Sequence, residues 1–282
     1  MEKGTKTQVI KNEAFTAEIY IDKFNKRVRV DDLNGNIAKA LSKSEEIAKE
    51  TKAEKLIIKG RKEHFPQLME HGYVCEAIID RYFLGSDLYF FSKYYSNNRR
   101  TSNHWLQEDE ITANVQKLEH DVITANPPDE YQLKKMTADD AERLAALYGE
   151  VFQIYPTPLN DPQYIKETME QGTIYYGFLY DGEIVSAASA EVNSFYKNAE
   201  LTDCATVPEH RKHGLMKILL EQLEEGLKAD GIYCAYSIAR ALSFGMNAAL
   251  HQLGYSYRGR LTNNCYIFDK LEDMNVWVKD LS

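Results

Sequence analysis

The spacing of apolar residues along the chain predicts a mixed α/β protein. In the C-terminal part, apolar side chains recur at helical spacing over 137–151, 215–230 and 247–252. Apolar runs typical of strands lie over 173–192, 199–207, 232–239, 255–261 and 264–270. The order helix, hairpin, strand, helix, strand, helix, strand, strand predicts a central mixed sheet flanked by helices.

Turn and cap residues sharpen these boundaries. Asp181-Gly182 joins two apolar runs, and this pair favours a type I′ hairpin turn because both central positions need positive φ. Thr137 with Asp140 three residues later is a capping pattern at the start of the first helix. Gly231 and Gly254 end the two later helices.

The pair Pro127-Pro128 interrupts the pattern, so we expect two domains, over 1–126 and 129–282. The first partly repeats the second, since a strand, a helix, Gly72-Tyr73 and a strand match a strand, a helix, Gly254-Tyr255 and a strand. This match indicates a smaller α/β domain that is a duplicated half. Chance convergence of common α/β patterns is the alternative.

Composition narrows the class of partner. The 282 residues carry a formal charge of −9, which argues against nucleic acid or an anionic membrane as the main partner. The longest apolar runs are shorter than a membrane span, and the first residues do not resemble a secretory leader, so we expect a cytoplasmic protein. Cys75, Cys204, Cys234 and Cys265 lie far apart without a CxxC pair, so neither a disulfide framework nor a metal site is expected.

A basic segment stands between the strand that ends near Val207 and the helix that follows. It reads Arg211-Lys212-His213-Gly214. Helix N-termini present unpaired N–H groups and a partial positive charge, and glycine lets a ligand approach the backbone closely. This corner therefore predicts an anion site, and a diphosphate is the ligand that such a corner suits.

At this point the sequence resembles the GNAT superfamily of acyl-CoA-dependent N-acyltransferases. Its pyrophosphate loop is Q/R-x-x-G-x-G/A, which Arg211-x-x-Gly214 follows, whereas Met216 departs from the small residue at the last position. The resemblance covers about residues 130–282 and implies acetyl-CoA as co-substrate. It implies that backbone groups of Thr206 and Val207 contact the pantetheine arm and thioester. The implied pyrophosphate contacts are Arg211, Lys212, His213, Gly214, Leu215 and Met216.

Within this superfamily, the chain is most similar to the β-lysine N6-acetyltransferases. The stretches that carry the likeness are YPTPLNDPQYI, SAASAEV, AELTDCATVPEHRKHGLM, SIARALSFGMNAA, GRLTNNC and EDMNVWVK. They imply acetylation of the terminal amine of β-lysine, a small-molecule substrate. The product, N6-acetyl-β-lysine, serves as a compatible solute in osmoadaptation, usually alongside a lysine 2,3-aminomutase.

The chemistry needs a carboxylate because an alkylammonium, with a pKa near 10.4, must lose a proton before it attacks. Glu200 is the predicted base, and an exposed residue on the strand face is the alternative reading. Asp203 either binds a substrate ammonium or caps a backbone group. In a regular strand it would face away from Glu200, and a bulge would bring the two together. Glu191 poses the same choice between contact with the substrate and capping of a backbone group.

Other candidate substrate contacts follow from position. Arg240 ends an apolar strand and is the predicted partner of the substrate carboxylate, with a surface ion pair as the alternative. Asn263 and Asn264 either form a turn or, as the resemblance implies, line the pocket. Tyr155 either covers the acceptor or packs in the core. The usual tyrosine acid of the superfamily is replaced by Leu250, which leaves His251, Tyr255 and Tyr236 as substitutes.

The N-terminal domain reads Asp31-Asp32 where a diphosphate would need positive potential, so we expect it to bind no CoA. It would shape the acceptor pocket or an oligomer interface, and a homodimer is one such assembly. Alternative functions are acetylation of a polyamine or of lysine, or a catalytically silent acyl-CoA sensor, as the absent tyrosine and Met216 suggest.

Overall fold

The computed structural model describes residues 5–120, 126–152, 155–211, 213–267 and 270–282. The N-terminal part contains strands β1 (Thr5–Lys11), β2 (Phe15–Asp22), β3 (Arg27–Gly35), β4 (Lys55–Gly60), β5 (Val74–Phe83) and β6 (Ser86–Tyr94). Its helices are α1 (Ile37–Glu50), α2 (Phe65–Glu70), α3 (Asn97–Arg100) and α4 (Trp105–Val115).

The C-terminal part contains strands β7 (Gln132–Lys135), β8 (Ile174–Tyr180), β9 (Glu183–Asn193), β10 (Asn198–Thr206), β11 (Cys234–Arg240), β12 (Ser256–Ile267) and β13 (Lys270–Asp280). Its helices are α5 (Ala141–Val151), α6 (Pro162–Glu170), α7 (Leu215–Ala229) and α8 (Phe244–Gln252). The expected hairpin turn is confirmed, because Asp181 and Gly182 both have positive φ, 49° and 83°. The capping pair Thr137 and Asp140 is confirmed as well.

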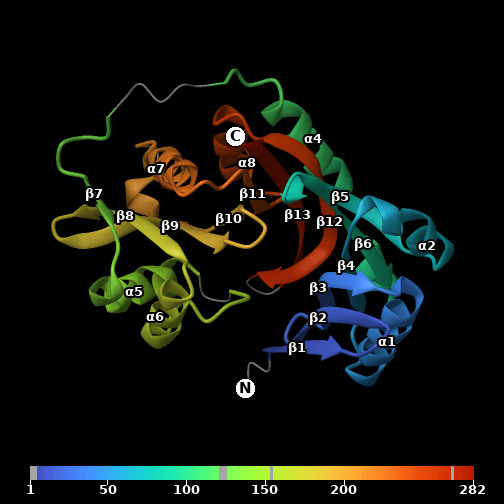
Figure 1. Ribbon diagram of the computed structural model, residues 1–282. Helices are drawn as coiled ribbons and strands as arrows, with labels where there is room; N and C mark the ends of the chain where they lie inside the picture. The colour runs from blue at the N-terminus through green and yellow to red at the C-terminus, as the bar shows by residue number, and fades with distance from the viewer. Residues whose placement is uncertain (1–4, 121–125, 153–154, 212, 268–269) are drawn as a thin grey trace.

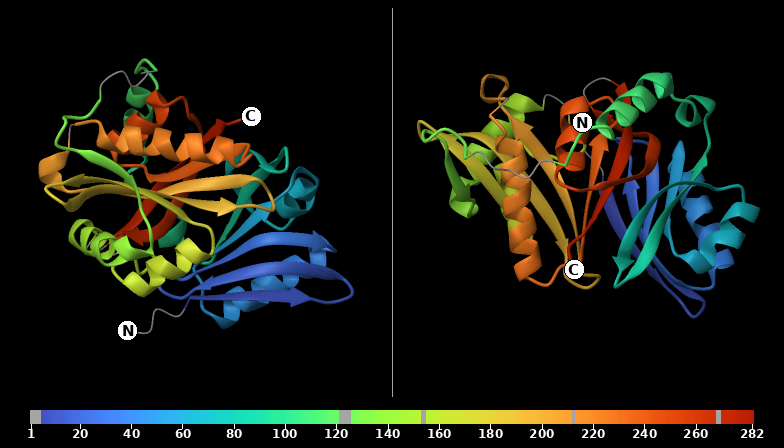
Figure 2. Two further views of the ribbon diagram at one scale, coloured as in Figure 1. Left: turned by 60° about the vertical axis from the view of Figure 1, so that its left-hand side comes forward. Right: turned by 90° about the horizontal axis from the view of Figure 1, so that it is seen from above.

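All these strands belong to one sheet of 13 strands in the order β1-β2-β3-β4-β6-β5-β12-β13-β11-β10-β9-β8-β7 (Figure 1). In the C-terminal part, the leucine stripe of α7 packs with α8 into one apolar cluster. Helices α5 and α6 lie on the opposite face of the sheet, around a second cluster, as Figure 2 also shows. No helix in the described ranges is long and apolar enough to cross a membrane.

The two parts repeat one topology. β1, β2, β3, α1, β4, α2, β5 and β6 follow one another as β8, β9, β10, α7, β11, α8, β12 and β13 do. Both series have the same neighbours and directions in the sheet, including one parallel pair, β3–β4 in the first and β10–β11 in the second. The predicted duplicated half is therefore confirmed in topology.

The Gly-Tyr match also has a structural basis. Gly72 and Gly254 follow α2 and α8 with φ of 77° and 87°. The next residue, Tyr73 or Tyr255, is 1% exposed and donates its N–H back to the helix, to the carbonyl of Leu68 or Leu250 at 3.0 Å. Both helices thus end in the same glycine-dependent turn.

The two repeats join where β5 meets β12. Gly259 lies opposite Ala77, and its φ is 126°. A Cβ at this position would stand 2.7 Å from the Ala77 Cα, closer than real Cβ contacts come. Glycine is therefore required for the repeats to approach each other at this seam.

The end of the chain differs from the sequence expectation. In place of two strands over 255–261 and 264–270 there is one long strand, β12, with register shifts after Tyr257 and Leu261. A further strand, β13, follows it. Of the two readings of Asn263 and Asn264, a turn is not the one that the structure shows, because both residues lie inside β12 and Asn263 has φ of 43°. β13 carries the buried polar residues Glu272, Asp273 and Asn275, so its apolar pattern is interrupted.

Candidate active site

The predicted anion corner has the expected backbone. A short 3-10 turn, Pro208–His210, leads from β10 toward Gly214, which has φ of 71° and occupies the N-cap position of α7. Its lack of a side chain leaves the first N–H groups of this 15-residue helix without a side-chain cap. Arg211 and His213 are exposed beside them. This corner fits a diphosphate; the predicted contact Lys212 lies outside the described residues.

Unlike Arg211 and His213, which are exposed, Leu215 and Met216 pack against the apolar core. Leu215 is 2% exposed, and Met216 packs against the same apolar cluster. Both side chains therefore help to anchor α7 on the core.

Strands β10 and β11 separate beyond Glu200. Their parallel pairing covers Asn198 to Glu200 only, and a cavity of about 170 Å³ opens between the strands past this point. The Val207 N–H is bonded to the Val185 carbonyl at 2.9 Å, so it is not available to a thioester. By the alternation of an antiparallel ladder, the backbone groups of Thr206 point away from β9. Consistently, Arg211 Nε donates to the Thr206 carbonyl at 3.2 Å.

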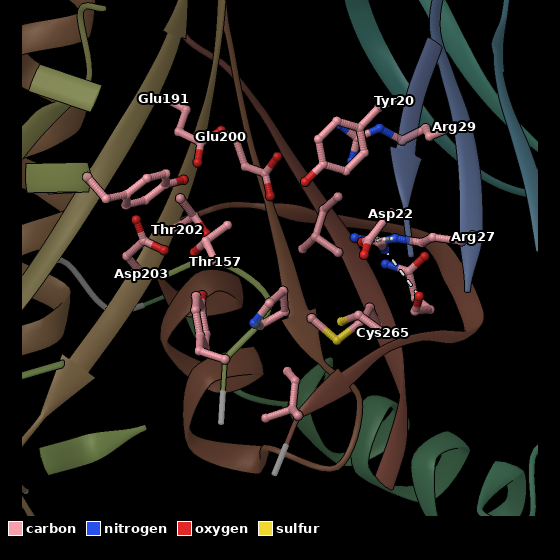
Figure 3. Close-up of a pocket in the computed structure, with 17 residues that line it drawn as sticks. Tyr20, Asp22, Arg27, Arg29, Thr157, Glu191, Glu200, Thr202, Asp203 and Cys265 are labelled. Atoms are coloured by element: carbon pink, nitrogen blue, oxygen red, sulfur yellow. Dashed lines mark hydrogen bonds and ion pairs between the residues drawn. The ribbon is translucent and has the colours of Figure 1, made fainter. Parts of the chain in front are cut away.

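A larger cavity of about 290 Å³ adjoins this one, and both are lined by Tyr155, Thr202 and Asp203. Figure 3 shows Glu191, Glu200 and Asp203 together on one wall, on the strands of the C-terminal repeat. Glu191 and Glu200 are direct partners across β9 and β10. Like charges opposed in this way repel each other, which is an arrangement expected at a site that receives a cation.

The environment shifts all three acids toward the protonated form. Burial, and then the charge of Glu191, raises the pKa of Glu200 to about 7, against the lowering effect of Lys59 and Arg29. The same two causes raise the pKa of Asp203 to about 7, although hydrogen bonds from Ser189 and Tyr155 oppose them. The pKa of Glu191 is raised too, chiefly by desolvation, although this residue is partly open to solvent and Arg29 and Lys59 favour its ionised form. Two groups that titrate near neutral pH suit proton transfer at pH 7.

Asp203 reaches this wall through a bulge. The register of β9 and β10 shifts between Thr202 and Ala205, and Asp203 has φ of 51°. Of the two alternatives for this strand, the structure shows the bulge, and it places Asp203 on the same cavity wall as Glu200. Ser189 Oγ donates to Asp203 Oδ2 at 2.7 Å. Tyr155 stacks on Phe152 at 4.5 Å, so the tyrosine both packs and borders the two cavities.

The opposite wall comes from the N-terminal repeat and was not predicted. Tyr20, Asp22, Arg27 and Arg29 line the larger cavity from β2 and β3, as Figure 3 shows. The sequence signal was the alternation in Arg27-Val28-Arg29-Val30, which places both arginines on one strand face. The N-terminal repeat thus lines the cavity that holds Glu200, and its role in shaping an acceptor pocket stays a prediction.

Arg240 and Asn263 hold places other than those expected for substrate contacts. Arg240 lines the smaller cavity and bonds the buried carboxylate of Glu272 at 2.8 Å, which matches the alternative of an ion pair. Asn263 donates its amide to the carbonyls of residues 98, 99 and 101 at 3.1–3.2 Å, so it fixes the C-terminal end of α3. Asn264 does line the larger cavity.

The substitutes for the absent tyrosine acid lie outside the walls of both cavities. His251 Nε2 is 3.0 Å from the Leu118 carbonyl, and the ring of Tyr255 lies under the ammonium of Lys279. Tyr236 instead contacts Glu200, the predicted base, and its hydrogen bond favours the ionised carboxylate. The described residues contain no group of His, Cys, Asp and Glu that could hold a metal ion.

In the N-terminal repeat, Asp31 and Asp32 are neutralised rather than exposed to a ligand. Asp31 pairs with Arg29 at 2.5 Å and Lys59 at 2.8 Å. Asp32 pairs with Arg61 at 3.0 Å and accepts a hydrogen bond from Tyr196 at 2.5 Å. The start of α1 is closed by its own cap, Asn36, which accepts from the N–H of Lys39. This corner therefore lacks the open helix start found at Gly214.

The chain is similar to known acetyltransferases in sequence. Residues 132–257 match the acetyltransferase (GNAT) domain family. N-acetyltransferase YodP of Bacillus subtilis strain 168 is 40% identical over 272 residues, 96% of this chain and 98% of that protein.

Two further relatives are named beta-lysine N(6)-acetyltransferase. The protein of Methanococcus maripaludis is 34% identical and covers 93% of this chain and 95% of its own length. The protein of Methanosarcina mazei is 37% identical over 74% of this chain and 85% of its own length. Among solved structures, an N-acetyltransferase from Staphylococcus aureus Mu50 matches 54% of this chain and 99% of its own, with 17% identity and a TM-score of 0.47.

Proposed function

The chain belongs to the GNAT acetyltransferases, enzymes that use acetyl-CoA, and from that premise we propose that it acetylates the terminal N6 amine of β-lysine. Two relatives that share 34% and 37% identity carry this activity in their names. The observation that carries the proposal is the larger cavity, with three carboxylates on one wall and two arginines beside Asp22 on the other. Such a cavity is complementary to a small substrate that bears both ammonium and carboxylate groups.

The acidic wall prepares the amine. A pH of 7 lies about three to four units below the pKa of an alkylammonium, so forming the free amine costs on the order of 4–5 kcal/mol. Glu191, Glu200 and Asp203 attract the cation, and Glu200 accepts its proton directly or through water. A base whose pKa is about 7 is ionised often enough to accept that proton at neutral pH.

Acetyl transfer then proceeds directly, without a covalent enzyme intermediate. The amine nitrogen attacks the thioester carbonyl, the C–S bond breaks, and CoA leaves as the thiol once its sulfur takes a proton. Thr206, whose backbone points into the gap between β10 and β11, would polarise the carbonyl through its N–H. Arg211 and the open start of α7 at Gly214 would hold the diphosphate.

The product, N6-acetyl-β-lysine, has lost the positive charge of the acetylated amine. With one ammonium and one carboxylate left, it is a neutral zwitterion. This is the charge state expected of a compatible solute, which is the role that we propose for it.

The test is release of free CoA from acetyl-CoA with β-lysine, lysine, spermidine and a lysine-containing peptide as acceptors. We expect kcat/KM for β-lysine to exceed that of each other acceptor by at least about tenfold, which corresponds to about 1.4 kcal/mol of selectivity. Mass spectrometry of the product locates the acetyl group on N6. Equal rates for β-lysine and spermidine, or acetylation at N3, would refute the assignment.

A further inference from the structure

The cavity has two chemically different walls, contributed by the two repeats. The acids Glu191, Glu200 and Asp203 lie on β9 and β10, whereas Arg27 and Arg29 lie on β3 (Figure 3). A diamine without a carboxylate needs the first wall only. The second wall, which belongs to the repeat that lacks an open diphosphate corner, therefore calls for a separate function.

Arg29 is held in place but keeps part of its donor capacity. Its Nε and Nη2 bond both oxygens of Asp31 at 2.5 and 3.0 Å, and the guanidinium lies over the ring of Tyr20 at 5.0 Å. Asp31 is shared with Lys59 at 2.8 Å, so two cations surround one carboxylate. Burial raises the pKa of Asp31, but Arg29 and Lys59 together outweigh this effect and keep the pKa below its ordinary value. The cluster thus retains one net positive charge at the cavity wall.

Arg27 is held by a similar arrangement. Its Nε bonds Asp22 at 3.0 Å, and one Nη bonds the backbone carbonyl of Asn264 at 3.1 Å. Both partners also line the cavity, and Asp22 is in turn bonded by the buried Asn25 at 2.7 Å. A guanidinium has five N–H donors in a planar fork, so each arginine can still bond a carboxylate.

We infer that the N-terminal repeat is the specificity element of the enzyme: Arg29, supported by Arg27, binds the carboxylate of an amino-acid acceptor. The reactive amine then lies against the acids of the other repeat. This inference rests on the proposed function for the identity of the reactive end. The inference places the binding site of the substrate carboxylate on the N-terminal repeat. Arg240, the partner expected from the sequence, instead forms an ion pair with Glu272 beside the smaller cavity.

The cavity size agrees with an amino acid of this kind. A volume of about 290 Å³ lies at the small end of ligand pockets, so it suits a metabolite rather than a protein segment. An extended amino acid that places its terminal amine at Glu200 would direct its other end toward β3.

The experiment compares β-lysine, lysine and cadaverine, a diamine without a carboxylate, with wild type, Arg29→Gln and Arg29→Lys. Loss of a charge-assisted hydrogen bond should lower kcat/KM for the two amino acids about 10- to 100-fold in Arg29→Gln, and that for cadaverine less than threefold. Arg29→Lys should recover part of the selectivity. Arg258→Gln, a change in an exposed ion pair with Asp80, is the matched control. It should leave kcat/KM for each amino acid unchanged relative to that for cadaverine.

A merely electrostatic role of Arg29 has a different signature. Arg29 favours the ionised form of Glu200, so its loss would slow all three acceptors by the same factor. Equal loss for cadaverine and β-lysine overturns the inference. Calorimetry measures binding of the three acceptors without the reaction, so it tests the role of Arg29 separately from the proposed function. If β-lysine is not acetylated, the inference stands only if wild type binds the amino acids more tightly than cadaverine and Arg29→Gln abolishes that difference.

Discussion

Arg29 and Glu200 hold the same position in the two repeats. Each is the third residue of the parallel ladder of its repeat, with Arg29 opposite Ile57 and Glu200 opposite Tyr236. Both line the larger cavity, from opposite walls. Burial lowers the pKa of Arg29, but Asp31, and to a smaller extent the charge of Glu200, raises it above its ordinary value; Arg29 in turn favours the ionised form of Glu200. One topological position thus supplies a cation in one repeat and the predicted base in the other.

The pH dependence of acetylation tests Glu200. The pKa of this carboxyl is raised to about 7, so the base is protonated below this value and ionised above it. We expect kcat/KM for the amine to rise through pH 7 in wild type. Glu200→Gln should lower it about 10²- to 10⁴-fold at pH 7, with partial recovery at alkaline pH as free amine accumulates. Steady-state rates from pH 5.5 to 10 measure this, with exposed Glu150→Gln as control. A variant profile that follows wild type would rule out Glu200 as the base.

Asp203 is expected to act on the amine rather than on CoA. Asparagine tolerates the left-handed backbone of this position, so Asp203→Asn removes the charge with little strain. Loss of a buried carboxylate near a cation should raise KM for the amine about 10- to 100-fold. KM for acetyl-CoA should stay within about twofold. If KM for acetyl-CoA rises by the larger factor instead, Asp203 belongs to the cofactor side of the site.

The raised pKa of Glu200 also has a cost in stability. Folding raises this pKa from 4.5 to about 7, so the native state binds the proton more tightly than the unfolded chain. Stability therefore falls as pH rises from about 4.5 to 7, and the full cost is present above pH 7. Glu200→Gln removes it and should raise the free energy of unfolding by about 1–2 kcal/mol at pH 8.5, after allowance for solvent screening. At pH 4 the two proteins should agree. Urea titrations at both pH values check this, and an equal difference at both would contradict it.

Two glycines of the α7 region provide a matched pair. Both have space for a methyl group, but only Gly214 has positive φ. Gly214→Ala should cost about 1–2 kcal/mol of stability and raise KM for acetyl-CoA. Gly226→Ala, in the helix interior, should instead stabilise by up to about 1 kcal/mol and leave that KM unchanged. Thermal unfolding and acetyl-CoA saturation curves distinguish the two. A normal KM in Gly214→Ala would argue against this corner as the diphosphate site.

The seam between the repeats depends on Gly259. Gly259→Ala combines a strained φ with overlap onto the backbone of Glu76 and Ala77, so we expect a loss of more than about 3 kcal/mol. Gly85→Ala is the control, because its φ of 103° is similarly strained while the space around it is open. The difference between the two variants isolates the contact between repeats. If both lose the same amount, close approach at this seam does not limit stability.

Local patterns predicted much of the C-terminal repeat. The Asp181-Gly182 turn, the cap at Thr137 and the leucine stripe of α7 depend on neighbours in sequence, so a linear pattern contains them. The proximity of Glu191 and Glu200 could be predicted as well, because the strands that carry them are consecutive in the chain and adjacent in the sheet.

What escaped prediction depends on contacts between distant segments. The pocket wall formed by Arg27 and Arg29 requires knowing that β3 faces β10 across the cavity, which no local pattern states. Arg240 looked available because its partner Glu272 lies 32 residues away on β13. β13 itself was missed because buried Asp273 and Asn275 find partners only in the folded protein.

Joining both copies in one polypeptide has an evolutionary consequence. In an assembly of two identical subunits, every substitution appears twice, so a base could not change to arginine on one side alone. The covalent connection of the two copies in one chain removes that coupling, and each copy can then accumulate changes independently. Selectivity for a new acceptor can therefore evolve through β2 and β3 while the residues that perform acetyl transfer stay constant.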